Sequence, residues 1–377
     1  MSVRYRSKAH LIVIATVVHI TLGSLLLLSN LCASAQTRFM ETKATGDQRG
    51  EPELVICTQN LKNYSIADAA MTGQSERKRD QHRALIARFV RAKCDVIAVQ
   101  EVIGRYQKNA ERVLQALGRA LANRTNRSYI YRTGESNDKF LKLGFLIAAD
   151  RASVIATASY ADVVLPKFSS DEKPRNFSRG PLEVTLDVKG RGNSSSRKVV
   201  LVNMHFKSRR GGSRDAGKLE FEIVRMQEAE TLRRVLESRH PTAFEHESEV
   251  VVVLGDRNSH FDTASAKILN GSVPLKYFLG SGTCRLSKRG VPLCKPNAME
   301  PAKLFSVLTN DKDLRGLPGT YVKKNIASWI DDILISQPAL SLAWETVGSE
   351  GDYDSGLVTE YRDASDHALA YVVLNWG

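Results

Sequence analysis

The sequence VVVVLGDRN at residues 250–258 decides the fold. Its first five residues are apolar and mostly β-branched, which predicts a strand buried on both faces. The apolar run ends at Gly255, and two polar residues, Asp256 and Asn258, follow at once. Ligands of layered α/β proteins commonly bind where the chain leaves such strands. The stretch therefore predicts a central strand and one part of a functional site.

Short apolar runs of the same kind recur on both sides of this stretch. They are LVICT from residue 54, DVIAVQ from 95, LGFLIA from 143, LEVTLDV from 182, KVVLVNMHF from 198, IDDILIS from 330 and ALAYVVLNW from 368. Apolar residues at near-helical spacing in 75–93 and 215–238 predict two helices between them. Strands mixed with helices indicate a layered α/β protein. No linker or internal repeat divides residues 54–377, so we expect one domain there.

The first 35 residues have a different composition. A basic start precedes an apolar stretch at 11–31, which ends in the small residues ASA at 33–35. This pattern predicts a secretory signal peptide over 1–35, followed by a polar linker over 36–53. An uncleaved membrane anchor is the first alternative, because the apolar run is long enough to span a bilayer, and a lipid anchor on Cys32 is the second. We expect a secreted or periplasmic monomer with no stable membrane span after cleavage.

The charge of the chain favours anionic partners without identifying one. The formal net charge is +13. A basic surface concentrates polyanions such as nucleic acids, but it also attracts acidic membranes and promotes simple solubility. Charge alone therefore leaves these alternatives open.

The cysteines outside the predicted signal fall into two pairs. Cys284 and Cys294 flank a loop rich in Gly, Ser, Lys and Pro, which suits a local disulfide in an exported protein. Cys57 and Cys94 lie in or beside apolar strands, where we expect small buried thiols. No CxxC pattern indicates zinc.

Further polar residues follow the predicted strands and share one chemical character. They are acids, amides and histidines, namely Asn60, Glu101, Asn203, His205, Asp256, Asn258, Asp331, Asp366 and His367. Each one alone has a structural explanation, since Asp or Asn after a strand commonly forms a turn. The set contains no Ser/His/Asp elbow and no histidine cluster at metal-ligand spacing.

This inventory suits the hydrolysis of a phosphodiester. Mg²⁺ prefers carboxylate oxygen, which Glu101 and Asp366 supply. The attacking water needs a carboxylate and an amide, which Asp256 and Asn258 supply. Charge that builds up on phosphate oxygens needs donors, and Asn203, His205 and His367 are the candidates for them.

The motifs recur in a recognisable order. They are TQNL (58–61), DVIAVQEV (95–102), SRGPLEV (178–184), NMHFKS (203–208), GDRN (255–258), GTY (319–321), WIDDILIS (329–336) and SDH (365–367). In this order the sequence resembles the endonuclease/exonuclease/phosphatase superfamily over essentially all of 54–377. The resemblance implies a four-layer α/β sandwich, in which two packed, mainly antiparallel sheets are flanked by helices, with the site at one edge of the sheets.

The resemblance also implies a metal site and a water site. Glu101 would ligate Mg²⁺, with Asn60 nearby and Asp366 supporting the metal or the phosphate. Mn²⁺ and Ca²⁺ are alternatives to Mg²⁺. Asp256 and Asn258 would handle the nucleophilic water.

The same resemblance implies how the phosphate is held. Asp331 would orient His367, and His205 would stabilise the phosphate or assist the leaving oxygen. Arg179 would contact phosphate, and the alternative for it is a structural role in its loop.

Three departures from the family pattern affect what the resemblance implies. Gln59 stands where an aromatic residue is common, and Arg257 fills a position that is often apolar or aromatic. The stretch FLKLGFLI at 140–147 offers no carboxylate to orient His205, unlike enzymes of the deoxyribonuclease I branch. The sequence therefore does not identify a residue that would orient His205.

The loop after His205 bears on the substrate. The stretch HFKSRRGGSRDAGK at 205–218 resembles a glycine-containing loop of bacterial extracellular nucleases. Lys207 and Arg209 would hold the phosphates of DNA or RNA there, and a solvated loop without a ligand is the alternative. A sphingomyelinase or phospholipid phosphodiesterase is the second hypothesis, with SVPLKYFLG at 272–280 as the one candidate apolar surface. A binding module that has lost catalysis is the third.

Overall fold

Two six-stranded sheets form the middle of the computed structural model, which describes residues 53–71, 75–209, 219–323, 326–345 and 352–376. The first sheet has the order β15-β16-β1-β2-β4-β3. Its strands are β1 (Leu54–Tyr64), β2 (Val96–Ile103), β3 (Tyr129–Thr133), β4 (Leu141–Ala148), β15 (Ser355–Val358) and β16 (Leu369–Leu374). The second sheet has the order β11-β14-β8-β7-β6-β5. Its strands are β5 (Ala152–Ser159), β6 (Leu182–Val188), β7 (Arg197–His205), β8 (Val250–Asp256), β11 (Leu304–Ser306) and β14 (Asp331–Ser336).

Each sheet has a parallel pair of strands at its centre. In the first sheet β1 pairs with β2 in parallel, and in the second β7 pairs with β8 in parallel. The other strand pairs of both sheets are antiparallel. Each parallel pair requires a crossover connection, which contains helix α3 (Glu76–Arg91) or helix α5 (Glu222–Arg239). The expected mainly antiparallel sheets are confirmed.

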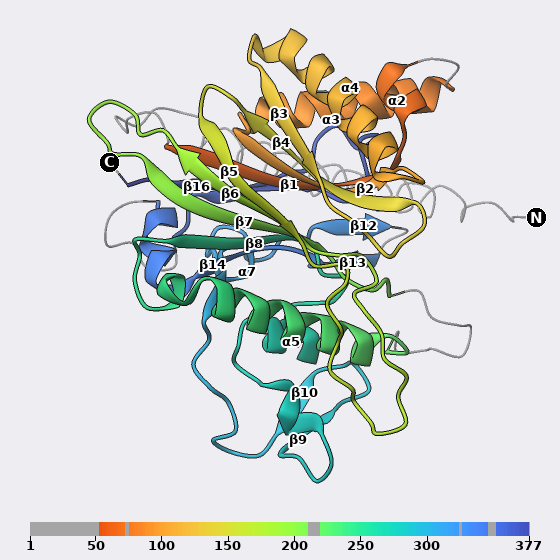
Figure 1. The fold of residues 1–377 in the computed structure, drawn as a ribbon, viewed down its shortest axis with the longest axis vertical. Helices are drawn as coiled ribbons and strands as arrows, with labels where there is room; N and C mark the ends of the chain where they lie inside the picture. Colours follow the sequence, from red (N-terminus) through yellow and green to blue (C-terminus); the bar gives the residue numbers. More distant parts are fainter. Residues whose placement is uncertain (1–52, 72–74, 210–218, 324–325, 346–351, 377) are drawn as a thin grey trace, which may run out of the picture. The chain divides into compact units, whose positions relative to one another are not determined.

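Helices cover the outer faces of the two sheets (Figure 1). Helices α2 (Ile66–Ala70), α3 and α4 (Gln107–Thr125) lie over the first sheet, and α5 lies beneath the second. Val251 and Val253 of β8 pack with Met226 and Leu232 of α5 in one buried cluster. All five apolar residues of VVVVL are fully buried. The four-layer α/β sandwich and the strand buried on both faces are therefore confirmed.

The predicted helices agree with the structure in part. The helix expected within 75–93 is α3, and the helix expected within 215–238 begins only at Glu222. Helix α4 was not among the predicted elements. Its buried residues Val113, Leu114, Leu117 and Leu121 nevertheless have helical spacing, so the signal was present in the sequence.

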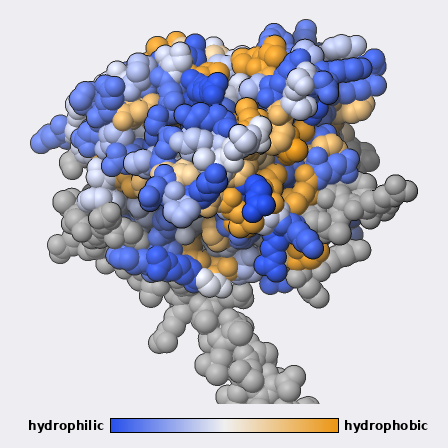
Figure 2. Space-filling view, turned by 90° about the horizontal axis from the view of Figure 1, so that it is seen from below, coloured by the Kyte–Doolittle hydropathy of each residue, from blue (hydrophilic) through white to orange (hydrophobic). Residues whose placement is uncertain are grey.

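The remaining elements connect the sheets. They are α6 (Ala264–Leu269), α7 (Val307–Asn310), the short strands β9 (Cys284–Leu286), β10 (Pro292–Cys294), β12 (Tyr321–Lys323) and β13 (Ile326–Ser328), and the 3₁₀ turns η1 (Pro241–Phe244), η2 (Leu275–Phe278) and η3 (Gln337–Ala343). Strands β9 and β10 form a hairpin beyond α5 (Figure 1). On this lower face of the molecule, hydrophobic side chains are interspersed with hydrophilic ones (Figure 2).

Both cysteine pairs are disulfides. The expected local bridge between Cys284 and Cys294 is confirmed, and it joins β9 to β10. The expectation of two buried thiols at Cys57 and Cys94 was wrong, because these residues form a disulfide with a Cα–Cα distance of 5.9 Å. Strand β1 lies next to β2, and Cys94, two residues before β2 begins, is thereby close enough to Cys57 of β1 to form the bridge.

Several predictions concern residues outside the described ranges. They are the signal peptide over 1–35, the linker over 36–53 apart from Glu53, and the basic loop over 210–218. In the part of the chain that the structure describes, no helix combines the length and the hydrophobicity needed to cross a membrane.

Candidate active site

Three neighbouring strands of the second sheet bring three of the predicted site residues together. Asp256 is the last residue of β8, and in the strand register it lies opposite His205 of β7 on one side and Asp331 of β14 on the other. Residues in register on adjacent strands share one face of a sheet. The three side chains therefore converge at one end of the sheet.

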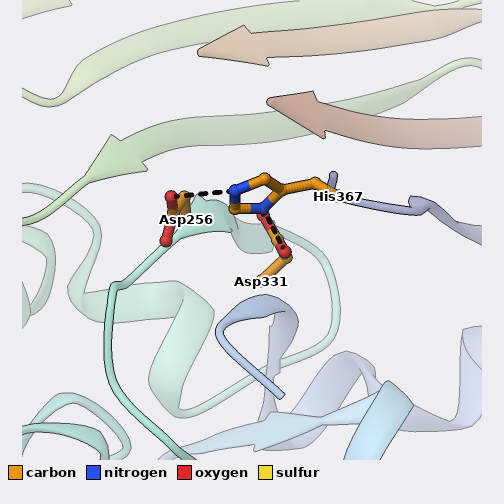
Figure 3. Close-up of side chains that lie close together, drawn as sticks. All are labelled: Asp256, Asp331 and His367. Carbon is orange, nitrogen blue, oxygen red and sulfur yellow. Dashed lines mark hydrogen bonds and ion pairs between the residues drawn. The ribbon is translucent and has the colours of Figure 1, made fainter. Parts of the chain in front are cut away.

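His367 completes this group from the segment that precedes β16. Its Nδ1 lies 2.8 Å and 3.1 Å from the two carboxylate oxygens of Asp331, and its Nε2 lies 4.0 Å from Asp256 Oδ2 (Figure 3). Burial alone would lower the pKa of His367, but the charge and hydrogen bond of Asp331 raise it to about 9. His367 is thus a buried cation at neutral pH whose Nδ1 contacts the Asp331 carboxylate, and the predicted orienting role of Asp331 in catalysis stays a prediction.

Asp256 lies at the centre of the group. Its Oδ2 accepts a hydrogen bond from Asn60 Nδ2 at 3.1 Å and lies 3.6 Å from His205 Nε2. Burial, together with the negative charge of Asp331, raises the pKa of the Asp256 carboxyl to about 7. This pKa is suited to a group that takes a proton from water near neutral pH.

Asn60 joins Asp256 to a second carboxylate. Besides Asp256, the Asn60 amide donates to Glu101 Oε1 at 3.2 Å, and Glu101 Oε2 accepts from the backbone N of Asn63 at 2.9 Å. Glu101 has a φ of 60°, a left-handed conformation that is uncommon outside glycine and recurs at functional sites. The structure therefore brings both carboxylates together across the two sheets.

Asp366 lies beside this pair through Lys62. The ammonium group of Lys62 is 3.6 Å from Asp366 Oδ1, and the backbone N of Lys62 donates to Asn60 Oδ1 at 2.9 Å. Asp366 is also close enough to raise the pKa of its neighbour His367. Asp366 is thus at the rim of the group, with its side chain 14% exposed.

Asn258 and Arg179 both hold the chain just after β7. The Asn258 amide donates to the carbonyl of Phe206 at 3.1 Å, and Arg179 Nη1 donates to the same carbonyl at 2.8 Å. The backbone N of Asn258 also donates to Asp256 Oδ1 at 2.8 Å. Arg179 therefore supports the loop beside the site, which is the structural alternative considered for it.

His205 is fully buried and neutral. Burial, with the positive charges of Arg179 and His367, holds its pKa well below the usual 6.5. Among the described residues its Nδ1 has no hydrogen-bond partner, in line with the missing carboxylate in 140–147. The matching strand β4 instead carries Lys142, whose Nζ donates to the carbonyl of Asp138 at 2.5 Å.

Asn203 lies deeper between the two sheets than the other residues. Its amide nitrogen donates to the carbonyls of Val99 and Gly144, each at 3.0 Å, and its oxygen accepts from Gln100 Nε2 at 2.8 Å. These bonds use both of its donors to hold the two sheets together. The predicted contact of Asn203 with a phosphate stays a prediction, and this geometry does not favour it.

The two basic residues after β7 lie at different places. Lys207 stacks its ammonium group over the ring of Phe221 at 4.5 Å. Arg209 Nη1 donates to Ser328 Oγ at 3.1 Å. Burial lowers the pKa of Arg209, and the nearby charge of Asp256 opposes this shift. Arg209 therefore lies within electrostatic range of Asp256.

Tyr321 belongs to the site but was not among the predicted site residues. Its ring meets the His367 ring edge to face, with centroids 4.9 Å apart. The signal in the sequence was the GTY motif at 319–321, which contains Tyr321.

Residue 255, just before Asp256, must be glycine, because a Cβ there would lie 2.2 Å from the carbonyl oxygen of Met204. Only glycine thus lets the β8 backbone approach β7 so closely before Asp256.

Arg257 explains one of the departures from the family pattern. Its side chain is buried and pairs with Asp332, and its Nη2 donates to the carbonyl of Trp329 at 3.1 Å. Asp332 also accepts a hydrogen bond from Ser306 Oγ at 2.5 Å. Arg257 therefore fixes the chain on either side of Asp331 rather than contributing to the site itself.

The donor set can be tested against a divalent cation. Asp256, Asp331 and His367 place one ligand atom each within 4.8 Å of one another, so this buried group could hold a metal ion. Both oxygens of Asp331, however, already lie within hydrogen-bonding distance of His367 Nδ1. The carboxylate oxygens Glu101 Oε1 and Asp256 Oδ2 form a second pair, gathered around the Asn60 amide nitrogen at 3.2 Å and 3.1 Å, and hard oxygen donors are what Mg²⁺ prefers. The residues present fit a metal of this kind.

Comparison with known proteins gives a structural resemblance only. No family model matches the sequence, and no curated protein matches it. A structure of D. rerio TDP2 complexed with single strand DNA product matches 86% of this chain and 99% of its own, at 16% identity and a TM-score of 0.46. An endonuclease/exonuclease/phosphatase family protein from Bacteroides thetaiotaomicron matches 87% and 100%, at 13% identity and a TM-score of 0.47. The mannosyl-6-phosphatase Bt3783 of the same organism matches 86% and 100%, at 13% identity and a TM-score of 0.46.

These matches extend over most of the chain and include proteins of the superfamily that the motif order resembles. One of these proteins was solved with a single strand DNA product and another is a mannosyl-6-phosphatase, so they do not agree on a substrate. Identities of 13% to 16% and TM-scores below 0.5 describe a resemblance in fold. The function must therefore follow from the geometry of the site itself.

Proposed function

We propose that the chain is a metal-dependent phosphoesterase and that its substrate is a phosphodiester of DNA or RNA. The observation that carries the proposal is the centre made by Asn60, Glu101, Asp256, Asp331 and His367. Within it, one amide bridges two carboxylates, and a third carboxylate holds a buried histidine cation. This combination offers both a site for a hard cation and donors for a phosphate.

The chemistry is divided among the residues of the centre. Glu101 and Asn60 would hold Mg²⁺, with Asp366 supporting the metal or the phosphate from the rim. When bound, the cation would neutralise charge on the phosphate oxygens. Asp256 orients the attacking water and accepts its proton, and Asn258 fixes the position of Asp256 through its backbone N–H.

Two histidines complete this division of labour. His367, held by Asp331, donates a hydrogen bond from Nε2 to the charge that develops on the phosphate. His205 is neutral and contributes a hydrogen bond to the phosphate or to the leaving oxygen.

A nucleic acid is favoured by the basic groups around the centre. Arg209 is close enough for its pKa to respond to Asp256, and Lys62 forms an ion pair with Asp366 at the rim. Cations beside a hydrolytic centre can contact the phosphates that flank the scissile one. The net charge of +13 suits a polyanionic partner of this kind but does not single it out. Lys207 would add a further contact from the same loop.

A phospholipid phosphodiester is the second candidate. The segment 272–280 gives it little support, because Val273 and Leu275 are buried. The observation in its favour is the β12–β13 hairpin, where Val322 and Ile326 are 50% and 54% exposed. Since Tyr321 of the same hairpin meets His367 edge to face, an apolar surface there would lie beside the site.

Export from the cytosol is part of the proposal. It is supported by the signal-like residues 1–35 and by the two disulfides, since disulfides persist in oxidising compartments. We propose that the protein acts in the periplasm or outside the cell.

A substrate panel tests the proposal. The purified protein with Mg²⁺ is incubated with plasmid DNA, single-stranded DNA, RNA and sphingomyelin vesicles, and His367→Ala serves as the matched inactive variant. We expect cleavage of DNA or RNA by the wild type and loss of it in the variant. Release of phosphocholine without any cleavage of nucleic acid would replace the nuclease by the lipid enzyme. Full activity of His367→Ala would refute the assigned centre.

A further inference from the structure

The segment between β15 and β16 carries two residues of the proposed centre on irregular backbone. It runs from residue 359 to 368 and includes Asp366 and His367. Within it, the backbone N of Ala364 donates to the carbonyl of Tyr361 at 2.9 Å, and the backbone N of His367 donates to Ser365 Oγ at 3.2 Å. The position of His367 therefore depends on bonds that this segment makes to neighbouring elements.

Arg88 of α3 supplies two of these bonds. Its Nη1 donates to the carbonyl of His367 at 2.6 Å, and its Nε donates to the carbonyl of Glu360 at 3.0 Å. A single planar guanidinium thus holds both ends of the segment. The Arg88 side chain is only 2% exposed, although it comes from a helix on the outside of the first sheet.

Gln59 of β1 completes the arrangement. Its Nε2 donates to the carbonyl of His367 at 3.3 Å and to the carbonyl of Asn60 at 2.8 Å, and its oxygen accepts from Arg88 Nη1 at 3.0 Å. The same amide therefore contacts the backbone of both Asn60 and His367. Gln59 replaces the aromatic residue that the superfamily resemblance leads one to expect there, and an aromatic ring would make none of these three bonds.

The cost of burying Arg88 indicates that its bonds matter. Its three hydrogen bonds go to neutral oxygens, those of two backbone carbonyls and one amide. Burial disfavours the charged form of Arg88 and lowers its pKa to about 10, a penalty that the negative charge of Glu360 offsets only in part. An apolar side chain would fill the same space without that penalty. What arginine adds is a rigid set of directed donors.

We propose that Arg88 and Gln59 are positioning residues that set the distance of His367 from Asp256 and Asn60. This inference rests on the proposed hydrolytic function of the centre. Neither side chain contacts the reacting atoms. They act through the His367 carbonyl, to which both donate, and Gln59 couples that carbonyl to the backbone of Asn60.

Kinetics of three variants test the proposal on the substrate that the panel identifies. Arg88→Met and Gln59→Leu should each lower kcat about 10- to 100-fold, which is typical for residues that orient the groups of a metal site. KM should stay within about twofold, because substrate contacts are unchanged. The kcat of the double variant should be only slightly below that of the less active single variant, because both residues hold the same carbonyl.

A matched control separates positioning from general stability. Arg151 is also a buried arginine that donates to backbone carbonyls, those of Glu53 and Lys189, at the opposite end of β1 from Asn60. Arg151→Met should lower the thermal midpoint without a comparable loss of kcat. If Arg151→Met and Arg88→Met lose kcat in equal proportion to their loss of stability, or if Arg88→Met keeps the wild-type kcat, the proposal is wrong.

A measurement without substrate keeps the two proposals distinguishable. The imidazole signals of His367 in a nitrogen-15 NMR spectrum, assigned by their loss in His367→Ala, should form one sharp set in the wild type. They should shift or split in Gln59→Leu, which serves as the test if Arg88→Met fails to fold. Unchanged signals in Gln59→Leu would overturn the positioning role. A wild type that hydrolyses no phosphoester would instead refute the proposed function alone.

Discussion

Removing the disulfide between Cys57 and Cys94 should destabilise the protein more than removing the one between Cys284 and Cys294. The first bridge joins residues 37 apart in sequence, and the second joins residues 10 apart. A cross-link lowers the conformational entropy of the unfolded chain by an amount that grows with the logarithm of the loop it closes. For these two loops the expected contributions are about 4 and about 3 kcal/mol.

The location of each bridge widens this difference. Cys57 lies in β1, between β2 and β16 in the middle of the first sheet, so its bridge acts on global unfolding. The other bridge closes the β9–β10 hairpin, a two-stranded sheet that is separate from the two large sheets. Removing this bridge should therefore lower the free energy of global unfolding by less than the value expected from its loop length.

The assay is urea unfolding of two double variants, Cys57→Ala with Cys94→Ala and Cys284→Ala with Cys294→Ala, each followed by circular dichroism. We expect the first variant to lose about 4 kcal/mol of unfolding free energy and the second to lose clearly less, below about 3 kcal/mol. Equal losses in the two variants would refute the reasoning from loop length and location. Free thiols at Cys57 and Cys94 in the exported wild-type protein would refute its premise.

Three further perturbations have defined outcomes. Asp331→Asn should keep the fold but lower kcat by about 1,000-fold or more, as the loss of a histidine-orienting carboxylate does elsewhere, and steady-state kinetics measure it. Removing divalent cations with EDTA should abolish hydrolysis, and added Mg²⁺ should restore it, whereas full activity in EDTA would exclude a metal-dependent reaction. The third concerns pH and the pair of His240 and Glu183, whose atoms Nε2 and Oε2 are 3.2 Å apart. Burial opposes both charges, but the pairing raises the pKa of His240 above 6.5 and lowers that of Glu183 to about 2. The stability contributed by His240 should thus be lost as the pH rises through its raised pKa, and that of Glu183 as the pH falls from 4.5 toward 2. Between pH 2 and 9, the thermal midpoint of Glu183→Gln should change less steeply with pH than that of the wild type. Identical profiles for the two proteins would count against this linkage.

The central strands were predictable because their sequences are compatible with only one kind of secondary structure. A run such as VVVVL at 250–254 is too apolar for a surface and too β-branched for a helix, so a buried strand remains. Peripheral strands such as β5 were missed for the opposite reason. Most residues of β5 are at least partly exposed, so the strand lacks a continuous apolar run.

The site was predictable where chemistry depends on side chains that follow strands. Asp256, Asp331 and His367 could be paired because the motif order resembled a family. The bridge made by Asn60 between two carboxylates could not be derived, because it depends on how the two sheets pack. The same holds for Arg88, a residue of a surface helix whose partner His367 lies 279 positions away.

The most direct test of the proposed centre is the Mg²⁺ dependence of hydrolysis by the wild type and Glu101→Gln. Glu135→Gln serves as a control, because Glu135 is an exposed acid outside the centre. We predict that Glu101→Gln lowers the rate at a fixed Mg²⁺ concentration by about 10- to 100-fold and requires more Mg²⁺ for half-maximal activity, while the control matches the wild type. An unchanged Mg²⁺ dependence in Glu101→Gln would contradict the proposed centre.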